Sequence, residues 1–338
     1  MRSPKLRILT LFVSFFFVLS LAPSMTSFAA SNKCGNNLTW SFSGNTLTIS
    51  GSGDMYNFSH DGDGNDVPWK QYKKSIQKVV FSGNITSLGE FAFSGCSSLK
   101  SITIPKSVKF IGYSSLGETG LTSLTIPSTV EEIDDCAFVD NLALQNVVFA
   151  NGVKYIGTGA FAYCTNLKSV TLPNSIDEIN EGMFTDCKSL TSISIPGSVQ
   201  LICLEAFWGC SSLQSIYIPA SVTQISNNAF YKCTNLKKVS GGAKLKVISS
   251  EAFAYCTKLN TFVITSPVLK KIGPNAFYGD KCLKTVNIKK TTKLTKAGVK
   301  KSLKGSSVKT VKVKKSKVKK YKKFFKKSNS GRSVKVKK

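Results

Sequence analysis

IGTGAFAYCTNLKSVTLPNSI occupies residues 156–176, and two further stretches of the same pattern follow it directly. INEGMFTDCKSLTSISIPGSV occupies residues 179–199, and ICLEAFWGCSSLQSIYIPASV occupies residues 202–222. Copies recur in steps of 23 residues, with one shorter and one longer step, from apolar openers at Leu88, Ile111, Ile133, Ile156, Ile179, Ile202, Ile225, Ile248 and Ile272. About nine units at a fixed period of this size predict a solenoid, in which each repeat forms one coil of a stack.

Each unit contains an apolar opener, an Ala-Phe pair, a Cys, a Leu and an alternating apolar stretch that ends at a Pro. In the copy at Ile156, Val170 and Leu172 flank Thr171, and this period of two puts both apolar side chains on one face of a strand. Pro173 has no N–H to donate, so it ends the strand. Because one coil cannot bury its apolar residues alone, stacked coils are expected to pair one short parallel strand each.

The unit resembles the leucine-rich repeat of BspA-type bacterial surface proteins, which reads I-x-x-x-A-F-x-x-C-x-x-L-x-x-I-x-I-P-x-S-V. The resemblance covers roughly residues 85–290 and implies an α/β-solenoid of leucine-rich repeats in a secreted or surface protein. Departures are local: the second copy lacks the Ala-Phe pair and the Cys, and Asn141 and Asp280 replace the Cys in the third and ninth copies.

The first 30 residues have the composition of a secretory signal peptide. Arg2, Lys5 and Arg7 precede an apolar run over residues 8–21, and Ser27-Phe28-Ala29 offers a cleavage site. The run is too short to favour a spanning helix, and no second apolar run follows. We therefore expect an exported chain, secreted or retained at the cell surface, with no transmembrane segment after processing.

Residues 31–84 precede the repeats and predict an N-terminal cap. Leu38, Trp40 and Phe42 alternate before a Gly44-Asn45 turn, after which the alternation resumes, as in a β-hairpin. Such a module covers the first coil, whose unpaired strand would otherwise promote aggregation. The acidic stretch from Asp61 to Asp66 is either a solvated loop or a weak match to a calcium loop, which lacks the expected glycine and final acid.

The last fifty residues contain 22 Lys and Arg and no Asp or Glu, from Lys289 onward. Valines over residues 308–313 and at 334 and 336 predict strands, and residues 316–327 between them predict an amphipathic helix. A similar lysine-rich strand-helix-strand unit closes many BspA-type chains, so residues 291–338 are expected to form a C-terminal cap. Its surplus charge predicts binding to anionic cell-wall polymers through the outward lysines of the helix, Lys319, Lys320, Lys322 and Lys323. Nucleic acid is not the expected partner of an exported protein.

Ten cysteines in an exported chain raise the question of disulfides. Six of them share one position in the unit, three residues after the Phe, which we call the Cys slot: Cys96, Cys164, Cys187, Cys210, Cys233 and Cys256. Stacked neighbours could form disulfides, but the same slot accepts Asn141 and Asp280, which favours a reduced, buried ladder of thiols.

No catalytic, cofactor or metal site is expected. His60 is the only histidine, it is surrounded by no motif, and paired Cys-x-x-Cys spacing for zinc is absent. The acidic residues are scattered, so a glycosidase-type carboxylate pair is not indicated either.

Aromatic residues are the candidate binding residues of the repeats. One column follows the Ala-Phe pair, and Tyr217 is the one aromatic residue on the outward face of the predicted strands; the set is Tyr163, Trp208, Tyr217, Tyr231, Tyr255 and Tyr278. Such side chains either anchor ligands or pack between coils. The resemblance favours adhesion to a protein or glycan of a host or neighbouring cell. The alternative is a structural envelope component whose repeats have no specific ligand.

Overall fold

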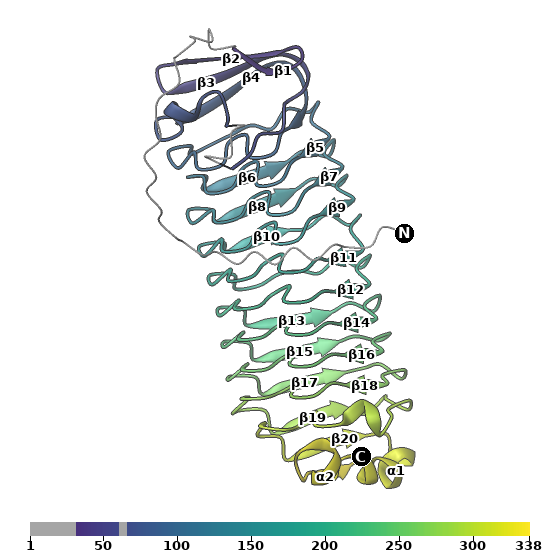
Figure 1. Cartoon of the computed structure of the whole chain (residues 1–338). Helices are drawn as coiled ribbons and strands as arrows, with labels where there is room; N and C mark the ends of the chain where they lie inside the picture. Colours follow the sequence, from purple (N-terminus) through teal and green to yellow (C-terminus); the bar gives the residue numbers. More distant parts are fainter. Residues whose placement is uncertain (1–31, 61–65) are drawn as a thin grey trace, which may run out of the picture. The chain divides into compact units, whose positions relative to one another are not determined.

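Most coils of the solenoid contribute two parallel strands and a chain of tight turns. The computed structural model describes residues 32–60 and 66–338, and Asn32–Lys338 forms one unit (Figure 1). The predicted signal peptide and residues 61–65 of the acidic stretch lie outside the described residues. Among those described, no helix has the length and apolarity needed to span a membrane.

The alternating stretch before the Pro forms the predicted strand, and these strands stack into what we call the long-strand ladder. Its members pair in parallel and in register within two groups, β6 to β10 and β13 to β21: β6 (Ser123–Ile126), β8 (Asn146–Phe149), β10 (Ser169–Thr171), β13 (Ser215–Ile218), β15 (Lys238–Gly241), β17 (Thr261–Ile264), β19 (Thr285–Ile288), β20 (Thr310–Val313) and β21 (Lys335–Lys337). Alternate residues are buried and exposed along them, as in Ser215–Ile218.

The sequence predicted one strand per coil, but a second strand forms at the repeat opener. Each is only two residues long, and together they make the short-strand ladder: β5 (Phe110–Ile111), β7 (Glu132–Ile133), β9 (Tyr155–Ile156), β11 (Glu178–Ile179), β12 (Leu201–Ile202), β14 (Gln224–Ile225), β16 (Val247–Ile248) and β18 (Lys271–Ile272). Two residues are too few for a period of two to be recognised in the sequence.

Tight turns around the Ala-Phe pair form the third side of the coil, which we call the turn edge. Glu205 and Gly209, two residues before and after Phe207, both have left-handed backbone, with φ of 55° and 73°. Their N–H groups and that of Phe207 donate to carbonyls of the next coil at 2.8–3.1 Å. The intervening N–H groups of Ala206, Trp208 and Cys210 donate within the coil instead, so both sets of donors are satisfied.

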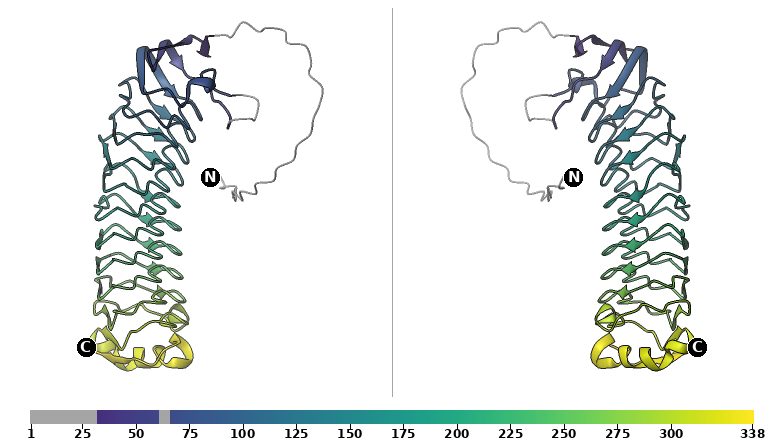
Figure 2. Two further views of the ribbon diagram at one scale, coloured as in Figure 1. Left: turned by 90° about the vertical axis from the view of Figure 1, so that its left-hand side faces the viewer. Right: turned by 90° about the vertical axis from the view of Figure 1, so that its right-hand side faces the viewer.

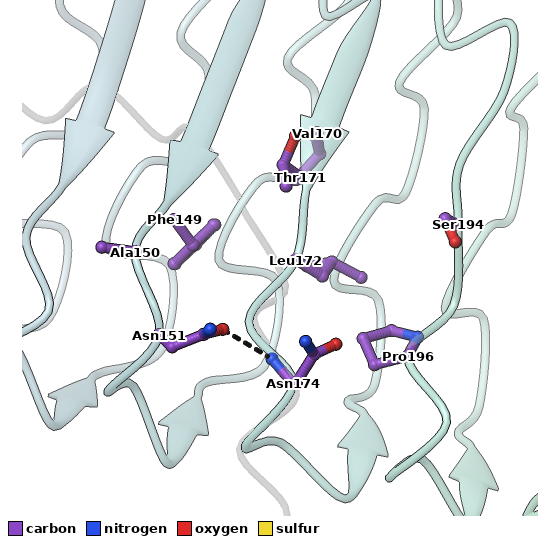
Figure 3. Close-up of a pocket in the computed structure, with 9 residues that line it drawn as sticks. All are labelled: Phe149, Ala150, Asn151, Val170, Thr171, Leu172, Asn174, Ser194 and Pro196. Carbon is purple, nitrogen blue, oxygen red and sulfur yellow. Dashed lines mark hydrogen bonds between the residues drawn. The ribbon is translucent and has the colours of Figure 1, made fainter.

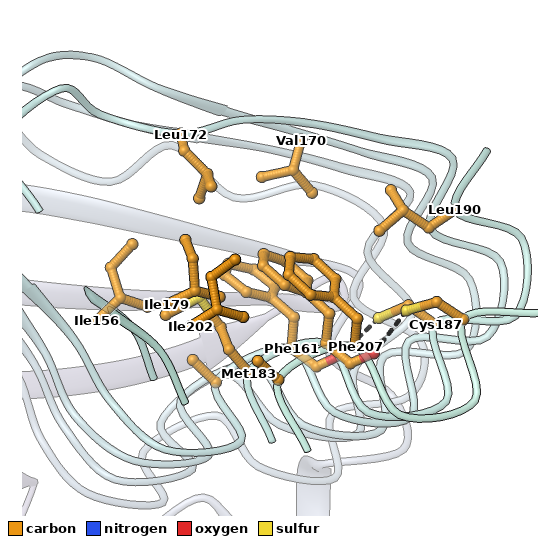
Figure 4. Close-up of a cluster of buried hydrophobic side chains, with 14 of the residues drawn as sticks. Ile156, Phe161, Val170, Leu172, Ile179, Met183, Cys187, Leu190, Ile202 and Phe207 are labelled. Carbon is orange, nitrogen blue, oxygen red and sulfur yellow. Dashed lines mark hydrogen bonds between the residues drawn. The ribbon is translucent and has the colours of Figure 1, made fainter. Parts of the chain in front are cut away.

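The core is a column of stacked phenylalanines between the ladders. From Phe138 to Phe253, ring centroids of successive coils lie 5.0–5.7 Å apart, and all these rings are fully buried (Figure 4). Trp69 continues the column at the N-terminal end, since its ring stacks on Phe93 at 5.9 Å and its Nε1–H donates to Ala92.

The N-terminal end contains the predicted hairpin. β1 (Lys33–Gly35), β2 (Leu38–Ser43) and β3 (Thr46–Asp54) are antiparallel, and the Gly44-Asn45 turn has positive φ at both residues. β4 (Lys78–Leu88) pairs with β3 and then with β5, which joins the hairpin to the short-strand ladder. A 3₁₀ turn, η1 (Lys70–Tyr72), lies between β3 and β4.

Helices lie at the C-terminal end of the stack (Figure 2). After η2 (Ala297–Val299) and β20 come η3 (Lys315–Lys317), α1 (Val318–Phe324) and α2 (Lys327–Ser330), and β21 then pairs with β20. Tyr321, Phe325 and Val336 are buried in this unit. The lysine-rich segment therefore has the predicted order of strand, helix and strand.

Candidate interaction surfaces

The Cys slot supplies a hydrogen-bond donor to the preceding coil. In five coils the buried thiol donates to the carbonyl of the Phe in the preceding coil at 3.1–3.2 Å, as Cys187 does to Phe161 and Cys210 to Phe184. Burial raises the pKa of Cys164 to about 12 and that of Cys187 well above its ordinary value, so these thiols stay protonated. The predicted buried ladder of free thiols is present, with a structural role.

The two exceptions in the Cys slot behave differently from each other. Asn141 donates from Nδ2 to Leu116 O at 2.7 Å, in the place of a thiol, and it accepts from the hydroxyl of Thr119. Asp280 is also buried, but both of its carboxyl oxygens lack a hydrogen-bond partner. Burial raises the pKa of Asp280 to about 9.

No group of three or more His, Cys, Asp or Glu able to hold a metal ion occurs among residues 32–60 and 66–338. His60 lies edge-on to Phe91, with ring centroids 6.0 Å apart. The calcium interpretation of residues 61–66 falls largely outside the described part of the chain, although Asp66 itself forms an ion pair with Lys70 at 2.8 Å.

The structure brings four of the six predicted aromatic residues into one strip, which we call the aromatic strip: Trp208, Tyr231, Tyr255 and Tyr278. Trp208 and Tyr231 stack with planes 3° apart and centroids separated by 6.1 Å, so each covers one face of the other. Tyr255 meets both neighbouring tyrosines edge-on, at 5.2 and 5.5 Å. The rings of the strip therefore pack against one another from coil to coil.

Lys232 lies against the aromatic strip and is not among the predicted binding residues. Its Nζ lies 5.2 Å from the ring centroid of Trp208 and 5.5 Å from that of Tyr231, within the range of a cation–π contact. Its signal in the sequence was its place directly after Tyr231, at the repeat position that Tyr163 and Tyr255 occupy in their own coils.

Tyr163 and Tyr217 lie apart from the strip and are more exposed. Tyr163 is on the turn edge and 45% exposed, with left-handed backbone at φ 62°. Tyr217 is 65% exposed on β13, on the outward face of the long-strand ladder.

Charge is divided unequally along the stack. Residues 90–205 contain twelve acidic and six basic residues, whereas residues 206–338 contain two acidic and 32 basic residues. In α1, Lys319, Lys320, Lys322 and Lys323 are exposed while Tyr321 is buried between them. The four predicted polyanion-binding lysines therefore share the outward side of one short helix.

Both ladders are interrupted between the coils that open at Ile156 and Ile179, an interface that we call the seam. β9 and β11 belong to different sheets, and β10 pairs with β8 but not with residues 192–195, which form no strand (Figure 1). At the short strand, the Asn180 side chain donates to Ile156 O at 2.7 Å, where Cys203 and Ser226 use their backbone N–H for the equivalent bond. The turn edge stays continuous, with Phe161 N–H bonded to Met183 O at 3.0 Å, and Ser189 N–H also donates to Thr165 O at 3.1 Å.

A pocket of about 450 Å³ opens at the seam on the long-strand side (Figure 3). It is lined by Phe149, Ala150, Asn151, Val170, Thr171, Leu172, Asn174, Ser194 and Pro196. The Asn174 N–H donates to Asn151 Oδ1 at 3.3 Å across its rim, and a smaller pocket of about 140 Å³ lies at the short-strand side of the same interface. Sequence reasoning missed both pockets.

Comparison with known proteins identifies the repeat. The sequence profile of the BspA type leucine rich repeat region (6 copies) matches residues 71–191, 177–300 and 247–338. No curated protein matches the chain.

Similar solved structures are bacterial leucine-rich repeat proteins. One from T. pallidum is 30% identical over 48% of this chain and 78% of its own, with a TM-score of 0.45. One from Bacteroides ovatus is 24% identical over 90% of this chain and 99% of its own, with a TM-score of 0.44. A leucine rich cell surface protein from Faecalibacterium prausnitzii is 19% identical over 90% of this chain and 93% of its own, with a TM-score of 0.36. With its profile matched from residue 71 to the last residue, this chain belongs to the BspA-type leucine-rich repeat family.

Proposed function

We propose that this chain is an exported, non-enzymatic surface protein that binds anionic envelope polymers through its C-terminal cap and presents its repeats to protein or glycan ligands. The observation that carries the proposal is the division of α1 into a buried aromatic side and an exposed lysine side. A cap needs the buried side alone, so the exposed lysines are available for another role.

Electrostatics supports a polyanion as the partner of the cap. No acidic residue occurs after Asp280, so the lysines of α1 have no carboxylate nearby in the sequence to neutralise them. A linear polyanion that displaces small counterions gains affinity from their release, and this gain falls steeply as salt concentration rises.

The repeats support the second half of the proposal through their exposed tyrosines. Tyr217 and Tyr163 present much of their rings to solvent on two different sides of the coil, and Tyr residues contribute strongly to interfaces. The self-packing of Trp208 on Tyr231 favours the alternative for that part of the surface, a structural component in which the aromatic strip stabilises the stack.

Binding to purified anionic cell wall tests the role of the cap. A variant with Lys319, Lys320, Lys322 and Lys323 changed to Gln is compared with the parent from low to physiological salt. The matched control changes four exposed lysines of the acidic half to Gln: Lys100, Lys106, Lys168 and Lys188. We expect weaker, less salt-dependent binding for the α1 variant alone. Equal loss in both variants would indicate net charge rather than a site, and no loss in either would overturn the proposal.

A further inference from the structure

We infer that the pocket at the seam is a binding site for a neutral, hydroxyl-rich glycan unit. The inference deepens the proposed function, because it rests on the repeats acting as a binding scaffold and assigns them one site and one ligand class. Its basis is the coincidence of an interrupted ladder, an uncharged polar lining and a local departure from the repeat.

The departure is Met183, which occupies the Ala position of the Ala-Phe pair. The other coils have Ala or Ser at this position, including Ala160 and Ala206 on either side. Met183 is fully buried in the core, in the coil between those of Phe161 and Phe207 (Figure 4). Interiors are close-packed, so a larger side chain must be accommodated by displacement of its neighbours.

The effect is seen in the backbone pairing where the Met183 coil faces the coil before it. The ring column itself is not broken there, since the Phe161 and Phe184 centroids lie 5.7 Å apart and Phe253 and Phe277 lie 6.1 Å apart where the ladders continue. The turn edge keeps its hydrogen bonds, while the backbone pairing is lost in both ladders. We therefore attribute the seam to Met183, and the pocket to the seam.

Loss of pairing leaves hydrogen-bonding backbone at the pocket. β10 uses one edge to pair with β8, and its other edge faces residues 192–195 without a ladder bond among the described residues. Buried or half-buried backbone groups are nearly always paired in proteins, so this edge favours a ligand that can both donate and accept hydrogen bonds.

The side chains of the pocket define the ligand further. None of the nine lining residues is charged, and Asn151, Thr171, Asn174 and Ser194 are exposed around the buried Phe149, Leu172 and Pro196. Amides and hydroxyls both donate and accept, as sugar hydroxyls do. The volume of about 450 Å³ falls within the usual range for small-molecule sites, about 300–1,000 Å³.

An extended peptide fits this pocket less well. A peptide that adds to a sheet edge needs a run of free backbone, whereas β10 has three residues and the next coil closes the far side. A polyanion would find no cation in the lining. A neutral glycan unit needs neither a run of free backbone nor a cation.

Titration of the full chain with N,N′-diacetylchitobiose, lactose and mannobiose, followed by calorimetry, tests the assignment. We expect at least one to bind, and Thr171→Val together with Asn174→Ala to weaken its affinity at least tenfold. Thr125→Val is the matched control, because Thr125 is exposed at the same repeat position on β6 and does not line the pocket. Absence of binding to all three sugars, or equal effects of Thr171→Val and Thr125→Val, would overturn the inference, as would binding of extended peptides alone.

Met183→Ala tests the origin of the pocket. We expect the coils to close, so that amides of residues 192–195 gain protection from hydrogen exchange while glycan binding is lost. Unchanged exchange and binding would show that Met183 does not hold the pocket open. Cell-wall binding is measured on the same variants. If it is retained when glycan binding is lost, the pocket acts separately from the cap. If the parent chain itself does not bind cell wall, that result counts only against the proposed function of the cap.

Discussion

The thiol of Cys210 donates to the carbonyl oxygen of Phe184 at 3.1 Å, and this bond joins two successive coils inside the core. The same bond forms in five coils, because in each the Phe carbonyl of the preceding coil faces the Cys slot. The slot therefore requires a donor that is small and tolerates burial. A neutral thiol or an amide meets that requirement, whereas an ionised carboxylate, which only accepts, does not.

Asp280 is the residue that breaks this rule, so Asp280→Asn should stabilise the protein above acidic pH. Its folded-state pKa of about 9 lies far above the ordinary value, so the proton is held more tightly in the folded state. The free energy of unfolding is therefore highest below the pKa of Asp in the unfolded chain, about 3.9, and it falls as the pH rises from there toward 9. We expect Asp280→Asn to raise the free energy of unfolding at pH 8 by about 1–3 kcal/mol, which is the usual cost of an unsatisfied buried polar group. Urea denaturation at pH 5, 7 and 9 measures it.

The reciprocal change provides the control for Asp280→Asn. Asn141→Asp places a carboxyl where an amide now donates to Leu116, so it should destabilise the protein increasingly as pH rises. Stability curves of parent and Asp280→Asn that run parallel from pH 5 to pH 9 would contradict the assigned role of Asp280.

The ladder thiols should not react with thiol reagents until the protein unfolds. Cys187, Cys210 and Cys233 are fully buried, and burial raises their pKa values, which leaves almost no thiolate at neutral pH. Cys282 is exposed and is the internal control, expected to react first in the native protein. Mass spectrometry of native and denatured labelled samples gives the readout. Rapid native labelling of the ladder, or none after denaturation, would be the contrary result.

Much of the fold could be predicted from the sequence because the repeated positions face a repeated environment. The alternating stretch ending at Pro173 gave the long strand, and the shared Cys slot gave the buried thiols. The short-strand ladder could not be recognised, since two residues carry no period, and the left-handed positions of the turn edge accept Glu205 as well as Gly209. Met183 was visible as a departure, but its effect depends on packing between coils, which one unit does not contain.

The candidate sites were less predictable than the fold. The column of aromatic residues was visible, yet whether Trp208 presents a ring face or covers Tyr231 depends on side-chain orientation across coils. The pocket could not be inferred, because its lining residues are ordinary repeat residues and the cavity between them results from the lost pairing.

Phe207→Ala should destabilise the protein by about 3–5 kcal/mol, since it removes a fully buried ring and leaves a cavity. Phe207 lies between Phe184 at 5.4 Å and Phe230 at 5.1 Å, so the loss should spread to both flanking coils, as expected for near-neighbour stability. Chemical denaturation with hydrogen exchange measures both effects. Ser215→Ala, at an exposed position of β13, is the control. A melting shift no larger than that of the control would contradict the core role of Phe207.

Removal of residues 291–338 should make the stack fray from its C-terminal end. β19 pairs along four residues with β20, and without it the β19 edge would present unpaired backbone to solvent and to other chains. We expect loss of exchange protection in β19 and then β17, together with concentration-dependent aggregation. The α1 lysine-to-Gln variant separates this role from charge, because exposed substitutions usually change stability by less than about 0.5 kcal/mol. A truncated chain that stays monomeric with β19 protected would show that the repeats need no C-terminal cap, and the lysine-rich unit would then be left with binding as its role.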